Sequence, residues 1–90
     1  MLFRSDLGEL EEARDLLRQA LASDEESFEP GHPTIAIRQS NLAMVLKDLG
    51  QLEEARDLLR KSYSVFLERL GPDHAHTKTV KANLDNLPEP

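Results

Sequence analysis

The sequence contains an internal repeat with a period of 42 residues. Residues 7–18 read LGELEEARDLLR, and residues 49–60 read LGQLEEARDLLR. When residues 3–44 are aligned without a gap to residues 45–86, 17 of the 42 positions are identical. Self-similarity at a fixed period of roughly 20–50 residues is typical of repeat proteins, in which each unit buries its apolar face against a neighbour. The sequence therefore predicts a stack of similar units.

Apolar residues within each copy recur at helical spacing. In the first copy they follow a +3/+4 pattern from residue 10 to residue 21, and charged residues of both signs occupy the positions between them. This pattern predicts an amphipathic helix with one buried stripe and one solvated face. Gly8 and Gly50 are expected to end one helix and turn into the next, and Pro33 suits the first turn of a helix. We predict an all-α fold of about four helices.

The repeat also divides the single expected domain into segments. We predict that residues 1–8 are the remnant of a preceding helix, residues 9–28 the second helix of a partial repeat, residues 33–70 one full helical hairpin and residues 74–87 a C-terminal capping helix. Asp73 is the expected N-cap of the last helix. Residues 23–27 are expected to fray or to face solvent, with Phe28 tying the loop to the core, and residues 87–90 to form a frayed tail. Asp85 replaces Ala43 of the first copy, which is typical of the polar outer face of a terminal repeat.

Charge and composition exclude several classes of function. Eleven basic and seventeen acidic residues give a net charge of −6, which disfavours binding to nucleic acid or to an anionic membrane. The chain has no cysteine, so disulfide and thiolate chemistry are excluded. No apolar run approaches the roughly 18 residues that a membrane-spanning helix needs. We expect a soluble, cytoplasmic protein that needs no cofactor.

No pattern in the sequence predicts catalysis or a metal site. Glu53 and Glu54 are adjacent on a helix and point in different directions, so they do not form a catalytic carboxylate pair. The sequence contains no Gly-rich phosphate loop, nucleophile elbow or zinc-protease motif. His32 and His74 recur at one loop position, but equivalent positions of a stacked repeat lie far apart, so packing near the helix starts is the favoured interpretation. We expect a non-enzymatic protein without a metal.

The repeated residues resemble the tetratricopeptide repeat. The matching positions are Asn41, Leu42, Ala43, Leu46, Leu49, Gly50, Leu52, Glu53, Glu54, Ala55, Leu59, Tyr63, Leu70, Gly71, Pro72, Asp73 and His74. The period of 42 residues, against the usual 34 or so, is similar to the longer variety found in kinesin light chains. One departure is Gln39, which stands where the family usually has an aromatic residue.

The resemblance implies a right-handed superhelix of helical hairpins, whose first helices line a concave groove for a peptide or partner protein. The positions expected on this groove are Ile37, Ser40, Asn41, Met44, Lys47 and Asp48 from one helix and Thr79, Ala82, Asn83 and Asn86 from another. Asn41 and Asn83 are one repeat apart, and an amide side chain offers a donor and an acceptor to a peptide bond. Hydrogen bonding between helices is the alternative role for this pair.

A second hypothesis concerns the N-terminal edge of the stack. The helix predicted from residue 9 has only a short segment before it, so its apolar edge is expected to be bare. The residues of this edge are Leu2, Phe3, Leu10, Ala13 and Leu17. Large exposed apolar patches mark interaction sites, which predicts a homodimer with a two-fold contact. A third interpretation, that the chain is a structural fragment of a longer multi-repeat scaffold, is compatible with both hypotheses.

Overall fold

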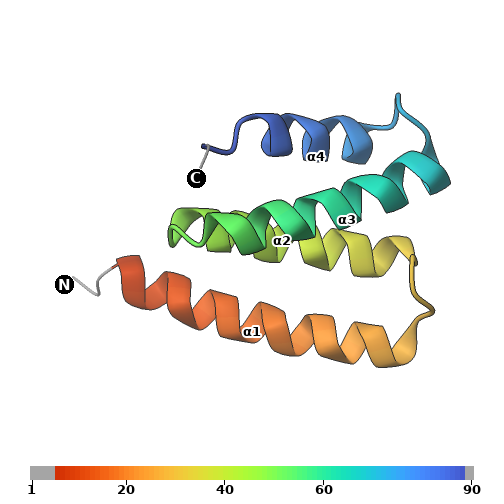
Figure 1. Ribbon diagram of the computed structural model, residues 1–90. Coiled ribbons are helices and arrows are strands. Elements are labelled where there is room, and N and C mark those ends of the chain that lie inside the picture. Colours follow the sequence, from red (N-terminus) through yellow and green to blue (C-terminus); the bar gives the residue numbers. More distant parts are fainter. Residues whose placement is uncertain (1–5, 89–90) are drawn as a thin grey trace.

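The computed structural model describes residues 6–88 of the chain. It contains four α-helices, α1 (Asp6–Ser27), α2 (Pro33–Asp48), α3 (Leu52–Leu70) and α4 (Ala75–Asp85). Each helix lies antiparallel beside the one before it, so that α2 and α4 run in the same direction (Figure 1). The described residues form no strand. The predicted all-α fold of helical hairpins is confirmed.

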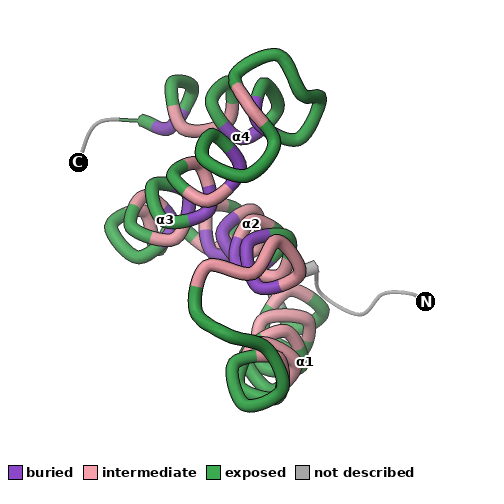
Figure 2. Tube along the Cα trace, turned by 90° about the vertical axis from the view of Figure 1, so that its right-hand side faces the viewer, coloured by how far each residue is buried: buried purple, intermediate pink, exposed green. Residues whose placement is uncertain are grey.

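The hydrophobic core is centred on the hairpin of α2 and α3. Leu42 and Leu46 of α2 and Leu59 and Phe66 of α3 are almost completely buried, and each such side chain contributes about 1.5–3 kcal/mol on burial. Ala43 is also fully buried, and its small side chain lets α3 approach α2 closely. Figure 2 shows most of the buried residues in these two helices and a few in and after α4, with α1 and α4 covering opposite sides of the hairpin.

Glycine ends α2 as the sequence predicts. Gly50 has φ +83°, and its N–H donates to the carbonyl of Lys47 at 2.9 Å, while the N–H of Gln51 donates to the carbonyl of Leu46 at 2.8 Å. These bonds satisfy carbonyls that the last turn leaves unpaired. The predicted turn at Gly8 is wrong, because α1 begins at Asp6 and continues through Gly8. Glycine permits both conformations, and the strong helix formers after it favour the helical one.

Histidine caps both α2 and α4. The Nδ1 atom of His32 accepts a hydrogen bond from the N–H of Thr34 at 3.0 Å, and the Nδ1 atom of His74 accepts one from the N–H of His76 at 3.0 Å. A side-chain acceptor at this position pairs one of the N–H groups that the first helical turn leaves free. The prediction that Asp73 caps α4 is therefore wrong, and the two recurring histidines have this role.

The end of α1 differs from the prediction of a frayed segment tied down by Phe28. The helix continues to Ser27, and Asp24, only 14% exposed in its side chain, accepts a hydrogen bond from Arg38 Nε at 2.8 Å. Phe28 is 37% exposed and stacks on His32 with the ring centroids 4.4 Å apart. The ion pair to α2, rather than an aromatic anchor in the core, holds this end of the helix.

The segment after α4 is also better ordered than predicted. Leu87 is only 6% exposed and belongs to the core. The carbonyl of Pro88 accepts a hydrogen bond from the Arg56 guanidinium at 2.8 Å. The predicted tail is wrong for these two residues, because an apolar side chain and a backbone acceptor both find partners in the core and on α3. The remaining residues of that tail, 89–90, lie outside the described residues.

Candidate functional site

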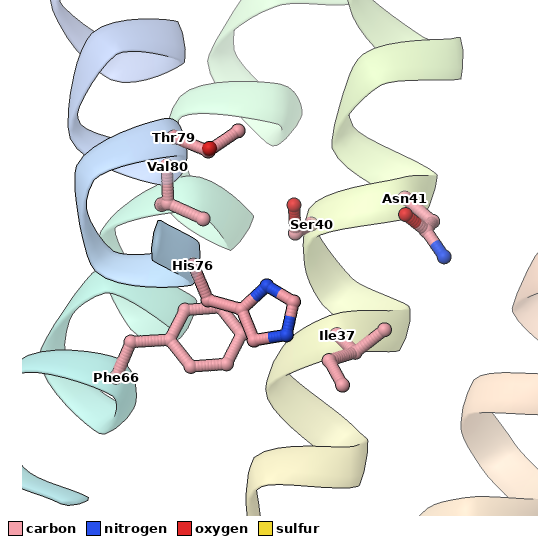
Figure 3. A pocket seen from close by; sticks show the side chains of 7 residues that line it. All are labelled: Ile37, Ser40, Asn41, Phe66, His76, Thr79 and Val80. Atoms are coloured by element: carbon pink, nitrogen blue, oxygen red, sulfur yellow. The ribbon is translucent and has the colours of Figure 1, made fainter. Parts of the chain in front are cut away.

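A pocket of about 160 Å³ lies between α2 and α4, with α3 at its base. Because α2 and α4 both run antiparallel to α3, they run parallel to each other (Figure 1). The pocket is lined by Ile37, Ser40 and Asn41 from α2, by Phe66 from α3 and by His76, Thr79 and Val80 from α4 (Figure 3). The site is therefore assembled from three helices that meet only in the folded chain.

The base of the pocket is apolar and rigidly held. Phe66 is 1% exposed and Val80 is 2% exposed, so both side chains are fixed by the core behind them. The His76 ring stacks on Phe66, with centroids 5.3 Å apart and an interplanar angle of 28°. Ile37 stands across the pocket on α2 and is 39% exposed. These four residues present a preformed surface that an apolar side chain of a partner could cover.

Hydroxyl groups supply the polar part of the pocket. Ser40 on α2 and Thr79 on α4 face each other across it (Figure 3). A hydroxyl can both donate and accept, so this pair can bond to a peptide carbonyl or N–H beside a buried side chain. Asn41 lies at the rim, and its amide is directed away from Phe66 and His76 (Figure 3).

The structure brings together four of the predicted groove residues, which are Ile37, Ser40, Asn41 and Thr79. The other predicted positions do not line this pocket and lie nearer the C-terminal ends of α2 and α4; they are Met44, Lys47, Asp48, Ala82, Asn83 and Asn86. Asn41 is exposed and Asn83 is half-buried. Their shared contact with a peptide stays a prediction.

Three pocket residues were not predicted from the sequence. Phe66 lies at helical spacing from apolar residues of its own helix, which indicates a core position, and Val80 has Arg38 as its counterpart in the first copy, so the repeat gives no indication of it. His76 has Thr34 as its counterpart, and no repeated pattern includes it. The aromatic residue near the end of α3, Phe66, is the sequence feature that indicates the pocket. It belongs to the second helix of its hairpin, which provides the base between the first helices α2 and α4.

The N-terminal edge predicted for self-association is partly covered. Leu17 is half-buried and packs against the core rather than standing at a bare edge, and Leu10 and Ala13 are also half-buried. Leu16 on this helix is instead exposed, at 60%. Leu2 and Phe3 lie outside the described residues.

Ion pairs join the helices on the outside of the stack. The Arg18 guanidinium of α1 donates to both carboxylate oxygens of Glu54 on α3, at 2.8 and 3.0 Å. Within α4, Lys81 donates to Asp85 at 2.9 Å, and this hydrogen bond and the charge of the carboxylate raise the pKa of Lys81.

Within residues 6–88, no group of three or more acidic, histidine or cysteine side chains could hold a metal ion.

Comparison with known proteins identifies the family. The model of the tetratricopeptide repeat matches residues 2–68 and, in a second overlapping register, residues 35–84. Among curated proteins, none matches the sequence closely enough to be called a relative. In the described part of the chain, every helix is too short or too polar to cross a membrane. The two family matches cover most of the sequence and include all of α2 and α3, and the chain therefore belongs to the tetratricopeptide-repeat family.

Proposed function

We propose that this protein is a non-enzymatic interaction module that holds an extended segment of a partner protein in the pocket between α2 and α4. Tetratricopeptide repeats generally mediate protein–protein interactions. The observation that carries the proposal is the pocket itself, in which a rigid apolar base of Phe66 and Val80 lies beside the hydroxyls of Ser40 and Thr79. That combination suits one apolar side chain together with the peptide backbone next to it.

The size of the pocket sets the kind of side chain that it accepts. Its volume of about 160 Å³ is close to that of an apolar cavity of about 150 Å³ that holds benzene. We therefore expect one leucine, isoleucine or phenylalanine side chain of the partner to enter it. Burying such a side chain provides about 1.5–3 kcal/mol, so the remaining affinity has to come from the backbone and from flanking positions. Asn41, Asn83, Lys47 and Asp48 are the proposed flanking contacts.

The proposal is tested with a library of labelled extended peptides, followed by fluorescence anisotropy on the best binders. Thr79→Trp fills the pocket from an exposed position and should weaken binding about tenfold or more. Lys78→Trp places the same ring on the adjacent exposed residue and should leave binding unchanged. Equal affinity of the two variants, or the absence of any library member that binds, would contradict the proposed site.

The role of the two asparagines is a separate question within the same assay. Asn41→Ala combined with Asn83→Ala should weaken every bound peptide by a similar factor, because amide side chains hold a backbone without reading its sequence. If the double variant binds as the unaltered protein does, these side chains take no part, and hydrogen bonding between helices becomes their role.

A second candidate function is self-association through the outer face of α1. Leu16, at 60% exposure, is the observation that favours it, because a leucine this exposed beside other apolar residues of α1 can pack against a second copy. Light scattering during size exclusion should then show a dimer that persists on dilution and is lost in Leu16→Glu. A monomer at every concentration would rule this function out.

The finer assignment to the kinesin-light-chain-like variety rests on the 42-residue period, and we propose it on that ground. The same period is compatible with a structural role as one part of a longer multi-repeat scaffold. We propose a cytoplasmic location for it.

Expression of the natural reading frame with a tag at each end, followed by measurement of the mass of the product, would test the scaffold proposal. A longer product would carry further copies of the repeat.

A further inference from the structure

A second cavity, of about 280 Å³, lies where α1 passes into α2. Its lining consists of Glu25 from α1, Pro30 and Gly31 from the connection, and Ile35 and Gln39 from α2. None of these residues lines the pocket between α2 and α4. The two cavities are therefore separate sites, and neither the family nor the proposed peptide contact assigns a role to this one.

The side chain of Gln39, which lines the cavity, has an acceptor without a hydrogen-bond donor within residues 6–88. The residue is 9% exposed, and its Oε1 atom is buried without a hydrogen-bond partner among the described residues. Buried side-chain acceptors are nearly always paired, because an unpaired one loses its hydration without compensation. Because Gln39 lines the cavity, a donor that enters from outside the chain could pair with this amide once its side chain adjusts.

Glu25, the acidic residue among those that line the cavity, favours a cationic donor. No ion pair in the described part of the chain includes Glu25. Its acidic neighbour Asp24 is already paired with Arg38 at 2.8 Å. Glu29 lies 4.0 Å from a guanidinium nitrogen of Arg69. Glu25 thus supplies an acceptor on the same cavity lining as Gln39 that is not used by another described residue.

The remaining walls suit the stem of a long side chain. Pro30 and Ile35 are apolar, and basic side chains bury their methylene groups along such surfaces while the charged head finds acceptors. A guanidinium has five donors in a planar fork and can bond to a carboxylate and an amide oxygen together, whereas an ammonium is a compact point charge. We propose that this cavity binds an arginine side chain of a partner protein, with Glu25 and Gln39 as the two acceptors.

The second copy of the repeat shows that the cavity chemistry is particular to the first. The counterparts of Glu25 and Gln39 are Leu67 and Lys81. Lys81 is itself a cation and bonds to Asp85 on its own helix. The second copy therefore has an apolar residue and a basic residue at the positions where the first copy has an acid and an amide. These two positions of the second copy do not offer acceptors to a second arginine.

The proposal is tested by titrating acetyl-Gly-Arg-Gly-amide into the ¹⁵N-labelled full chain and recording ¹H–¹⁵N spectra. The backbone N–H of Gly31 and the side-chain amide of Gln39 should shift saturably. The matching peptide with neutral citrulline should cause no saturable shift, and the lysine peptide should bind more weakly. An absence of saturable shifts with the arginine peptide, or equal binding of the citrulline peptide, would overturn the proposal. Free L-arginine binding more tightly than the peptide would overturn the assignment to a partner protein.

Two variants and a control locate the binding. Glu25→Gln alters an exposed side chain and should weaken the arginine peptide roughly threefold to fivefold. Glu26→Gln removes the adjacent exposed charge, which does not line the cavity, and should have a smaller effect. Gln39→Met keeps the volume, removes the acceptor and should weaken binding about tenfold, with the rest of the spectrum showing the native fold. Equal weakening by Glu25→Gln and Glu26→Gln would mean that the net negative charge of this surface, and not a contact with Glu25, attracts the peptide. That result would overturn the proposed contact.

Discussion

Replacing Thr77 by valine is predicted to stabilise the protein. Thr77 is 1% exposed, and its hydroxyl oxygen is buried without a hydrogen-bond partner within residues 6–88. The equivalent residue of the first copy is Ile35, which is buried and apolar. Burial of an unpaired hydroxyl costs about 1–3 kcal/mol in protein mutational data. Valine has nearly the same shape, is also β-branched and has a similar helix propensity, so most of this cost should be recovered.

A gain of about 1 kcal/mol raises the Tm of a domain of this size by roughly 4–8 °C. Thermal and urea unfolding followed by far-UV circular dichroism would measure it, and the urea m-value should not change, because the same surface is exposed on unfolding. Thr79→Val makes the same change at an exposed position of the same helix and should stay within about 0.5 kcal/mol of the unaltered protein. A Thr77→Val variant with an unchanged or lower Tm would refute the reasoning, since the hydroxyl would then be paired.

Three further predictions concern the ends of the helices and their external contacts. Leu87→Ala should lower the free energy of unfolding by about 2–5 kcal/mol in urea titrations; an effect near zero would mean that residue 87 is frayed. His74→Ala should cost about 1 kcal/mol in thermal unfolding and His74→Asn much less, whereas equal losses would exclude the capping role. A double-mutant cycle on Arg18→Gln and Glu54→Gln should give a coupling of about 1 kcal/mol or less that shrinks with salt, and a coupling that salt does not reduce would contradict a half-exposed pair.

The architecture could be predicted because its determinants are local. The apolar period of each copy, together with Pro33 and Gly50, predicts where α2 begins and where the chain turns into α3. The predicted hairpin ends at residue 70, and α3 does end at Leu70, where the Gly71-Pro72 pair follows. Gly8 shows the limit of this reasoning. It occupies the same repeat position as Gly50, yet lies inside a helix, since a glycine permits a turn without requiring one.

Contacts between distant segments could not be predicted in the same way. Leu87 is followed by proline near the end of the sequence, which is typical of a tail, and its burial depends on how α4 crosses the core. The hydrogen bond from Arg56 to the carbonyl of Pro88 joins residues that no periodic pattern relates. The histidine caps were missed because Asp, Asn, Ser and Thr dominate this position, and Asp73 stood immediately before His74.

The residues that line the pocket between α2 and α4 were predicted only on the side that the family resemblance describes. The resemblance placed Ile37, Ser40, Asn41 and Thr79 on a groove, because those positions follow from the register of one helix type. Phe66 reaches the pocket from the base and also belongs to the core, since it is 1% exposed. A residue that serves both core and site cannot be assigned to the site from its own helix alone.

The comparison of the two copies separates the residues that specify the fold from those that form the cavities. Some identical residues occupy frame positions, such as the buried Leu59 with its counterpart Leu17 and the histidines that cap α2 and α4. Among the residues that line the two cavities, only Asn41 and Pro30 recur in the other copy. Most cavity positions thus differ between the copies, while these frame positions are kept. It follows that exchanging cavity residues between copies should alter what is bound while the four helices remain as they are.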